Sequence, residues 1–163
     1  MVRKLEAAPV TMTAGTPAAY LRVRDGAMHG LGVGTTHDMT SVPRDIVWPS
    51  LTSPHYTLGE KIQLWRGKHS SGVSALWDEM MTTDLAGRVT ELALPAYFFH
   101  GVYDHTVDYQ LAKAYVEELK APLKGFYTFG RSARSPIMEE PQKAQRIMRE
   151  DVLAGTNSLA DGS

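Results

Sequence analysis

The chain has 163 residues, of which 43% are hydrophobic and 21% are charged, a composition typical of a globular protein with one hydrophobic core. Its formal net charge of -1 provides no basic face, so we expect no nucleic-acid partner. Because the sequence contains no cysteine, it excludes disulfides and zinc sites with thiolate ligands.

The opening residues, MVRKLEAAPVTMTAG, do not have the pattern of an export signal. Glu6 and Pro9 interrupt the apolar segment that a signal peptide needs. No apolar run in the sequence approaches the roughly 20 residues required to cross a bilayer. We therefore expect a soluble protein without a membrane partner, and cytoplasmic localisation is the default.

Residues 1–56 have the pattern of an irregular linker. Turn-forming segments punctuate this region, namely AGTP, DGAMHGLGVG and VPRD. The glycine-rich stretch within it is a weak match to a phosphate-binding loop, because neither a preceding strand nor the G-x-G-x-x-G spacing is present. We interpret it as a flexible connection.

Residues 57–90 predict a pair of helices. Thr57 and Glu60 fit a capping box, in which the two side chains satisfy free amide groups at a helix start. Apolar residues follow at helical spacing, and the second helix repeats the pattern of one buried stripe. The apolar positions are Leu58, Ile62 and Trp65 in the first helix and Val73, Leu76, Trp77, Met80 and Met81 in the second.

Residues 91–153 predict a strand, a helix, a strand and a helix. The apolar runs 94–99 and 125–129 are too short for helices and indicate buried strands. Thr106 is the expected cap of the first helix, which ends near Lys120, and Pro141 lies in the first turn of the second. Their expected inner faces are Val107, Leu111, Tyr115 and Leu119, and then Ala144, Ile147, Met148 and Val152. A helix that connects two strands of one sheet predicts parallel pairing, hence an α/β unit with both faces covered. We expect residues 154–163 to be disordered.

An acidic residue follows the first of these strands. In open parallel sheets, functional groups gather at the carboxyl ends of the strands. Asp104 lies at that edge, and the loop 130–136 lies at the equivalent edge after the second strand. An acid on one loop and a polar loop before a proline-led helix are arranged like the last two members of a nucleophilic triad.

At these residues the sequence resembles α/β-hydrolases of the prolyl-aminopeptidase-like kind. HGVYD is similar to the acid loop of that family, and SARSPIMEEP is similar to the loop that carries its catalytic histidine. The segments YTLGEKIQLWRG and SALWDEMMTTDL resemble the helical lid over the active site, with GLGVGTTHDMTS as the linker that enters it. The resemblance spans roughly residues 20 to 153 and is strongest in the last third. It implies an incomplete α/β-hydrolase fold with a partial parallel sheet and a lid, no cofactor, and hydrolysis through an acyl-enzyme.

The sequence departs from that family at the nucleophile and at the base. It contains no G-x-S-x-G, and the early strands that supply the oxyanion hole are missing. Asp104 matches the acid of the family, whereas Arg134 occupies the position of its histidine. A guanidinium stays protonated near neutrality and cannot act as a general base, although it could pair with Asp104.

Several other interpretations of the same residues remain open. Asp104 also fits a helix-entry acid bonded to nearby amides and to Thr106, and His100 or His105 could act as a displaced base. His100, Asp104, His105 and Asp108 are four potential metal ligands, but they straddle a strand end, a turn and a helix start, so we expect no metal site.

The lid-like helices and the short sheet raise the question of what covers them. Trp65, Trp77, Met80 and Met81 form an apolar stripe, which in the family lines the substrate channel. Two strands alone expose edges that invite association. We expect a homodimer that extends the sheet or exchanges lid helices, or a complementary chain that carries the nucleophile. Of three hypotheses, we favour a truncated hydrolase relative without activity of its own over half of a split serine hydrolase or a small interaction module.

Overall fold

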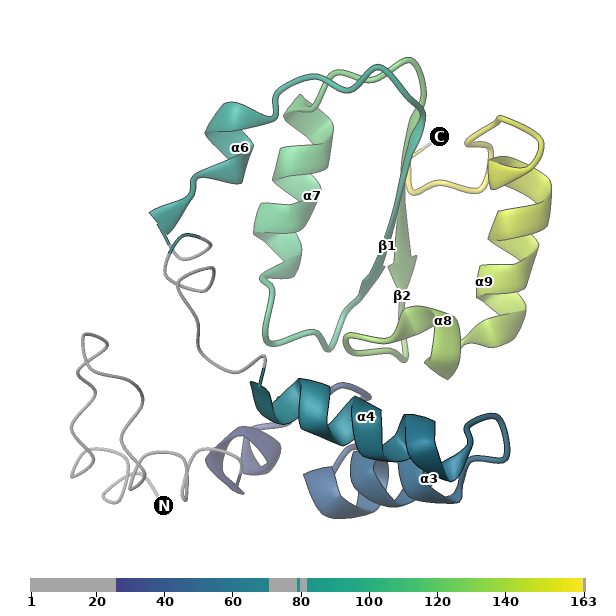
Figure 1. Ribbon diagram of the computed structural model, residues 1–163. Helices are drawn as coiled ribbons and strands as arrows, with labels where there is room; N and C mark the ends of the chain where they lie inside the picture. The colour runs from purple at the N-terminus through teal and green to yellow at the C-terminus, as the bar shows by residue number, and fades with distance from the viewer. Residues whose placement is uncertain (1–25, 71–78, 80–81, 163) are drawn as a thin grey trace. The chain divides into compact units, whose positions relative to one another are not determined.

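The computed structural model describes residues 26–70, 79 and 82–162 (Figure 1). The chain forms two compact units. The helical unit comprises residues 1–31 and 40–83, and the α/β unit comprises residues 32–39 and 84–163. Trp77, Met80 and Met81, which we predicted for the lid face, lie outside the described residues. No helix in the described ranges has the length and apolarity to span a membrane.

Residues 43–70 of the helical unit form three helical elements. They are the π-helix η2 (Pro43–Val47), α3 (Trp48–Thr52) and α4 (Leu58–Ser70). The capping box at the start of α4 is confirmed, because the Thr57 N–H donates to Glu60 Oε2 at 2.8 Å and the Glu60 N–H donates to Thr57 Oγ1 at 3.3 Å. These bonds satisfy two amide groups that the helix cannot.

The stretch Pro43–Thr52 is helical, although we expected irregular structure there. Each proline lies in the first turn of its element, where a missing N–H costs nothing. Asp45 accepts the amide protons of Thr40 at 2.8 Å and Ser41 at 2.9 Å, which ties down the entry to the helix. The prolines therefore start these helices rather than break them.

The α/β unit has the predicted order of strand, helix, strand and helix. It contains α6 (Leu85–Arg88), β1 (Ala96–Gly101), α7 (Tyr109–Glu118), β2 (Lys124–Phe129), α8 (Pro136–Glu139), α9 (Pro141–Ile147) and the π-helix η3 (Met148–Val152). β1 and β2 pair in parallel, from Ala96 opposite Lys124 to Gly101 opposite Phe129. In Figure 1, α7 lies on one side of the two strands and α9 on the other. The unit is therefore a small parallel sheet with a helix on each face.

The core of this unit lies between β1, β2 and α9. Its fully buried members are Tyr127, Phe129, Ala144 and Ile147, packed against the partly buried Tyr97, Phe99, Val152, Leu159 and Ala160. Ala144 and Ile147 confirm part of the predicted inner face of the last helix. The aromatic rings of neighbouring strands contact one another, and the ring centroids of Phe99 and Phe129 lie 5.4 Å apart.

The inner face of α7 differs from the prediction. Val116 and Leu119 are buried, whereas Val107 is 45% and Leu111 is 73% exposed. Val107 precedes the cap of α7 and so lies outside the helix. Leu111 lies five residues before the buried Val116, which at 3.6 residues per turn is about 140° around the helix. Asp108, not Thr106, caps this helix, because its Oδ1 accepts the Leu111 N–H at 2.9 Å.

Residues 154–162, which we expected to be disordered, fold against the sheet. The fully buried Asp151 organises them, since its carboxylate accepts hydrogen bonds from Thr156 Oγ1 at 2.7 Å, from the Ser158 N–H at 2.9 Å and from the Leu159 N–H at 2.8 Å. Tyr127 donates its hydroxyl to the same carboxylate at 2.8 Å. One buried acid thus satisfies the polar groups of a segment whose composition resembles a loose tail.

Candidate functional site

The carboxyl ends of β1 and β2 form the edge where we predicted the site. The two loops that leave this edge are bonded to each other, because the Val102 N–H donates to the Phe129 carbonyl at 3.0 Å and the Tyr103 N–H donates to the Ser132 carbonyl at 3.1 Å. A Cβ atom on Gly101 would lie 2.1 Å from the Ala133 carbonyl oxygen. Only glycine permits this approach.

Asp104 lies in the loop after β1 and organises that loop. Its Oδ1 accepts the Thr106 N–H at 2.9 Å and the Val107 N–H at 3.2 Å. The side chain is partly exposed. This geometry agrees with the interpretation of Asp104 as an acid bonded to nearby amides, one of the two readings that the sequence allowed.

The loop after β2 is held by Glu139, the last residue of α8, and by Glu140, which directly precedes α9. Glu140 Oε1 accepts the Arg131 N–H and the Ser132 hydroxyl, both at 2.8 Å, and Glu139 Oε2 accepts the Ala133 N–H at 2.9 Å. Burial alone would raise the pKa of Glu140, but the bonds from Arg131 and Ser132 hold this pKa below its usual value. The carboxylate therefore stays ionised and keeps the loop in place.

Arg134 is exposed at the tip of this loop. Within the described residues it has neither an ion pair nor a side-chain hydrogen bond, and it does not pair with Asp104 as the sequence allowed. Ser132, the neighbouring serine, is 0% exposed and donates its hydroxyl to Glu140. Ser132 is therefore not accessible as a nucleophile.

Within the described residues, the histidines near the edge form no ion pair with the Asp104 carboxylate. His100 stacks on Phe126 with centroids 5.8 Å apart and meets the edge of Tyr109 at 5.5 Å, which places its ring on the α7 side of the sheet. His105 is exposed. Asp108 is engaged as the cap of α7. In the described ranges, no group of three potential ligands could hold a metal ion, so these residues do not converge.

His37 is a neighbour of the edge that the sequence did not reveal. Its ring stacks on Tyr103 with centroids 3.8 Å apart, and its N–H donates to Glu139 Oε1. No local pattern marks a contact between positions this far apart, so sequence reasoning had no signal for it.

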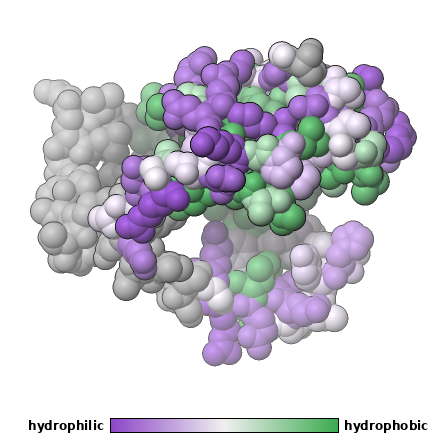
Figure 2. Space-filling view, turned by 90° about the horizontal axis from the view of Figure 1, so that it is seen from above, coloured by the Kyte–Doolittle hydropathy of each residue, from purple (hydrophilic) through white to green (hydrophobic). Residues whose placement is uncertain are grey.

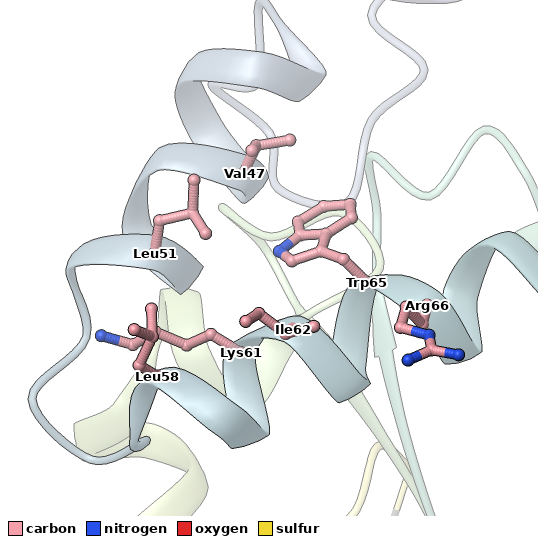
Figure 3. Close-up of a pocket in the computed structure, with 7 residues that line it drawn as sticks. All are labelled: Val47, Leu51, Leu58, Lys61, Ile62, Trp65 and Arg66. Atoms are coloured by element: carbon pink, nitrogen blue, oxygen red, sulfur yellow. The ribbon is translucent and has the colours of Figure 1, made fainter.

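The helical unit contains an apolar groove of about 590 Å³. Its lining residues come from η2, α3 and α4, and they are Val47, Leu51, Leu58, Lys61, Ile62, Trp65 and Arg66. Figure 3 shows Val47 and Leu51 facing Ile62 and Trp65 across the groove, with the two cationic side chains toward opposite ends. Trp65, one of the predicted lid residues, donates its Nε1–H to Ser50 Oγ at 3.1 Å.

Comparison with known proteins gives a partial relationship. The chain is similar to the probable aminopeptidase YbaC of Bacillus subtilis (strain 168), with 35% identity over 66 residues. The aligned part covers 40% of this chain and 21% of that protein, so the chain matches about a fifth of the length of this curated relative. No family model matches the chain, and no solved structure matches it. The similarity is consistent with a hydrolase-like relation.

Proposed function

We propose that this chain is a divergent relative of α/β-hydrolases of the prolyl-aminopeptidase-like kind that has no hydrolase activity of its own. The similarity to a probable aminopeptidase supports the relation. The loop after β2 carries the argument about activity, because Arg134, where the family resemblance implies the base, is exposed and has no ion pair within the described residues.

Acyl transfer by this route needs a nucleophile, a base that removes its proton and an acid that orients the base. Arg134 cannot accept a proton near neutral pH. The hydroxyl of Ser132 is buried and bonded to the Glu140 carboxylate. Asp104 binds two backbone amides of its own loop. The edge therefore has the scaffold of the last two triad loops without the reacting groups.

Covalent labelling with a fluorophosphonate, together with hydrolysis of aryl esters and proline aryl-amides, tests this proposal. We expect neither labelling nor turnover above the buffer rate for the natural chain. Arg134→His gives the same result, because an imidazole without a nucleophile gains nothing. Stoichiometric labelling of a serine in the natural chain contradicts the proposal. Turnover that appears only with a co-purified chain carrying G-x-S-x-G favours a split hydrolase instead.

The groove of the helical unit supports a second function, the binding of an aliphatic carboxylate. Among the described residues, five that line it are apolar, the other two are Lys61 and Arg66, and none is acidic. Neither cation forms an ion pair within the described residues. An apolar surface flanked by free cations attracts a ligand with an alkyl chain and a negative head group, and disfavours an ammonium.

Tryptophan fluorescence measured during titration with decanoate, decylamine and decanol tests this second function. We expect decanoate to bind most tightly, and the double variant Lys61→Met and Arg66→Met to lose that preference. Lys120→Met removes an exposed cation of the α/β unit and is the matched control, so it leaves the titration unchanged. Equal binding of all three compounds means that the groove is unselective and contradicts the assignment.

A further inference from the structure

The two outer edges of the sheet differ. The outer edge of β2 is covered by the segment that follows η3: the Lys124 carbonyl accepts from Asn157 Nδ2 at 2.9 Å, and the Phe126 carbonyl accepts from the Asp161 N–H at 2.8 Å. The Thr128 N–H donates to Asp161 Oδ2 at 3.1 Å. Outward-facing backbone groups of alternate β2 residues are thus hydrogen-bonded on the side away from β1.

The outer edge of β1 has no such cover in the part of the chain that the structure describes. The Ala96 N–H donates to the Leu123 carbonyl at 2.9 Å, and the Val102 N–H donates to the Phe129 carbonyl at 3.0 Å. These bonds fix the phase of the parallel ladder, so even-numbered residues of β1 point their N–H and C=O groups toward β2. Tyr97, Phe99 and Gly101 point theirs outward. Within the described residues, the backbone groups of Tyr97 and Phe99 have no partner.

The free edge has none of the devices that prevent strand addition. β1 reads AYFFHG, with no lysine or acid and no proline inside the strand. The residues that flank it are apolar and exposed, since Leu94 is 74% exposed and Val102 and Tyr103 are 38% exposed each. Hydrophobic side chains are visible among the hydrophilic ones on the surface of the molecule (Figure 2). An uncharged open edge of this kind accepts another strand through backbone bonds.

We propose that a second copy of this chain pairs antiparallel with β1, with Phe99 opposite Phe99 of the second copy at a two-fold axis. Phe99 then exchanges both backbone hydrogen bonds with its symmetry mate, and the Tyr97 carbonyl accepts the N–H of Gly101 of the second copy. The result is a four-stranded sheet whose outer edges are both covered by residues 157–161. This inference does not rest on the proposed function.

This register is favoured because it alone bonds all three outward residues. An axis at Phe98 leaves Gly101 opposite Pro95, and an axis at His100 leaves Tyr97 opposite Tyr103. Centring the axis on Tyr97 places Pro95 of one copy opposite Phe99 of the other, and proline has no N–H to donate. Centring it on Gly101 requires the strand to continue through Tyr103, whose N–H is already bonded to the Ser132 carbonyl. The register centred on Phe99 uses no proline and no residue beyond the strand.

The charge pattern favours a second copy as the occupant. The paired stretch runs from Tyr97 to Gly101 and contains no lysine, arginine or acid, so two copies of it meet without the like-charge repulsion that disfavours pairing. Leu94, just before the strand, and Asp104 of the second copy, just after its strand, then lie at the same end of the contact. A two-fold contact between identical edges is also closed, so it does not propagate.

Introducing a charge at position 94 tests the proposed dimer. Sedimentation of the full chain, from low to high micromolar concentration, measures the dimer Kd. We expect the natural chain to dimerise. Leu94→Asp brings a second acid to each end of the contact, where Asp104 of the second copy also lies, and raises the dimer Kd at least about tenfold, whereas Leu94→Lys does not raise it. Leu111→Asp is the matched control, because Leu111 is 73% exposed on α7 rather than at the edge, and it leaves the Kd unchanged.

Amide hydrogen exchange reads the register directly. The Tyr97 and Phe99 amides exchange more slowly as the protein concentration rises, because only the dimer bonds them. A compact monomer at every concentration overturns the proposal, as does a dimer that is broken by Leu111→Asp. If the chain is monomeric and both amides are protected at all concentrations, another segment of the same chain covers the edge and the proposal is also overturned.

Discussion

The α/β unit and the helical unit differ in what they do with their apolar residues. The α/β unit buries Tyr127, Phe129, Leu119 and Ile147 almost completely. Over residues 26–31 and 40–70 of the helical unit, the buried apolar residue is Ala27, whereas Trp48, Leu51, Leu58, Ile62 and Leu64 are exposed. Both regions have good local helix signals. The difference shows that a helical pattern and a capping box specify a helix without specifying what it packs against.

The largest effect that we predict concerns Asp151, which joins η3, β2 and the last residues. Asp151→Ala leaves a buried hydroxyl and several buried donors without an acceptor, and we expect it to destabilise the α/β unit by about 4 kcal/mol. Native-state hydrogen exchange at the Tyr127 and Phe129 amides measures this. Exchange in α4 stays unchanged if the two units are independent. A loss below about 1 kcal/mol would mean that the network is not formed in solution.

Two isoleucines, one in each unit, test whether the two units differ in how tightly their apolar residues are packed. Ile147 is 2% exposed in the core of the α/β unit, and Ile62 is 52% exposed in the groove of the helical unit. Ile147→Ala should cost about 3 kcal/mol because it leaves a cavity, whereas Ile62→Ala should cost less than about 1 kcal/mol. Urea unfolding followed separately in each unit provides both values. Equal costs would show that Ile62 is covered in solution, which would break the contrast between the units.

Acid should weaken the α/β unit through two buried carboxylates. Burial favours protonation of Asp151, but the bonds from Thr156, Leu159, Tyr127 and Ser158 hold its pKa well below the usual value, and the pKa of Glu140 is lowered in the same sense. A lowered pKa gives stability that is present above the unfolded value near about 4 and is lost as the pH falls toward the folded value.

One such carboxylate cannot change the free energy of unfolding by more than about 1.4 kcal/mol per pH unit. We therefore expect the free energy of unfolding of the α/β unit to be level above about pH 5 and to fall between about pH 4 and pH 2. Asp151→Ala should flatten that fall. An unchanged slope in the variant would assign the acid sensitivity to Glu140 or to other carboxylates.

The sequence predicted what local rules determine and missed what distant contacts determine. The two strands and the capping box follow from short apolar runs and from residues three apart. The cover of the β2 edge depends on Asp161 and Asn157, which lie more than thirty positions from their partners in the sequence. At the candidate site, the positions of Asp104 and Arg134 at strand ends followed from the topology, but nothing local indicates whether two such side chains pair.

The smallest effect that we predict lies in the helical unit. Thr57→Ala removes the hydroxyl that accepts the Glu60 N–H, and the loss of such a cap costs about 1 kcal/mol. Because few apolar residues of this unit are buried, we expect this modest loss to raise amide exchange along the first turns of α4 while β2 stays unaffected. Thr57→Ser keeps the hydroxyl and is the control. If Thr57→Ala also accelerated exchange at Tyr127, the two units would unfold together, and the contrast between a packed and an open region would not extend to their stability.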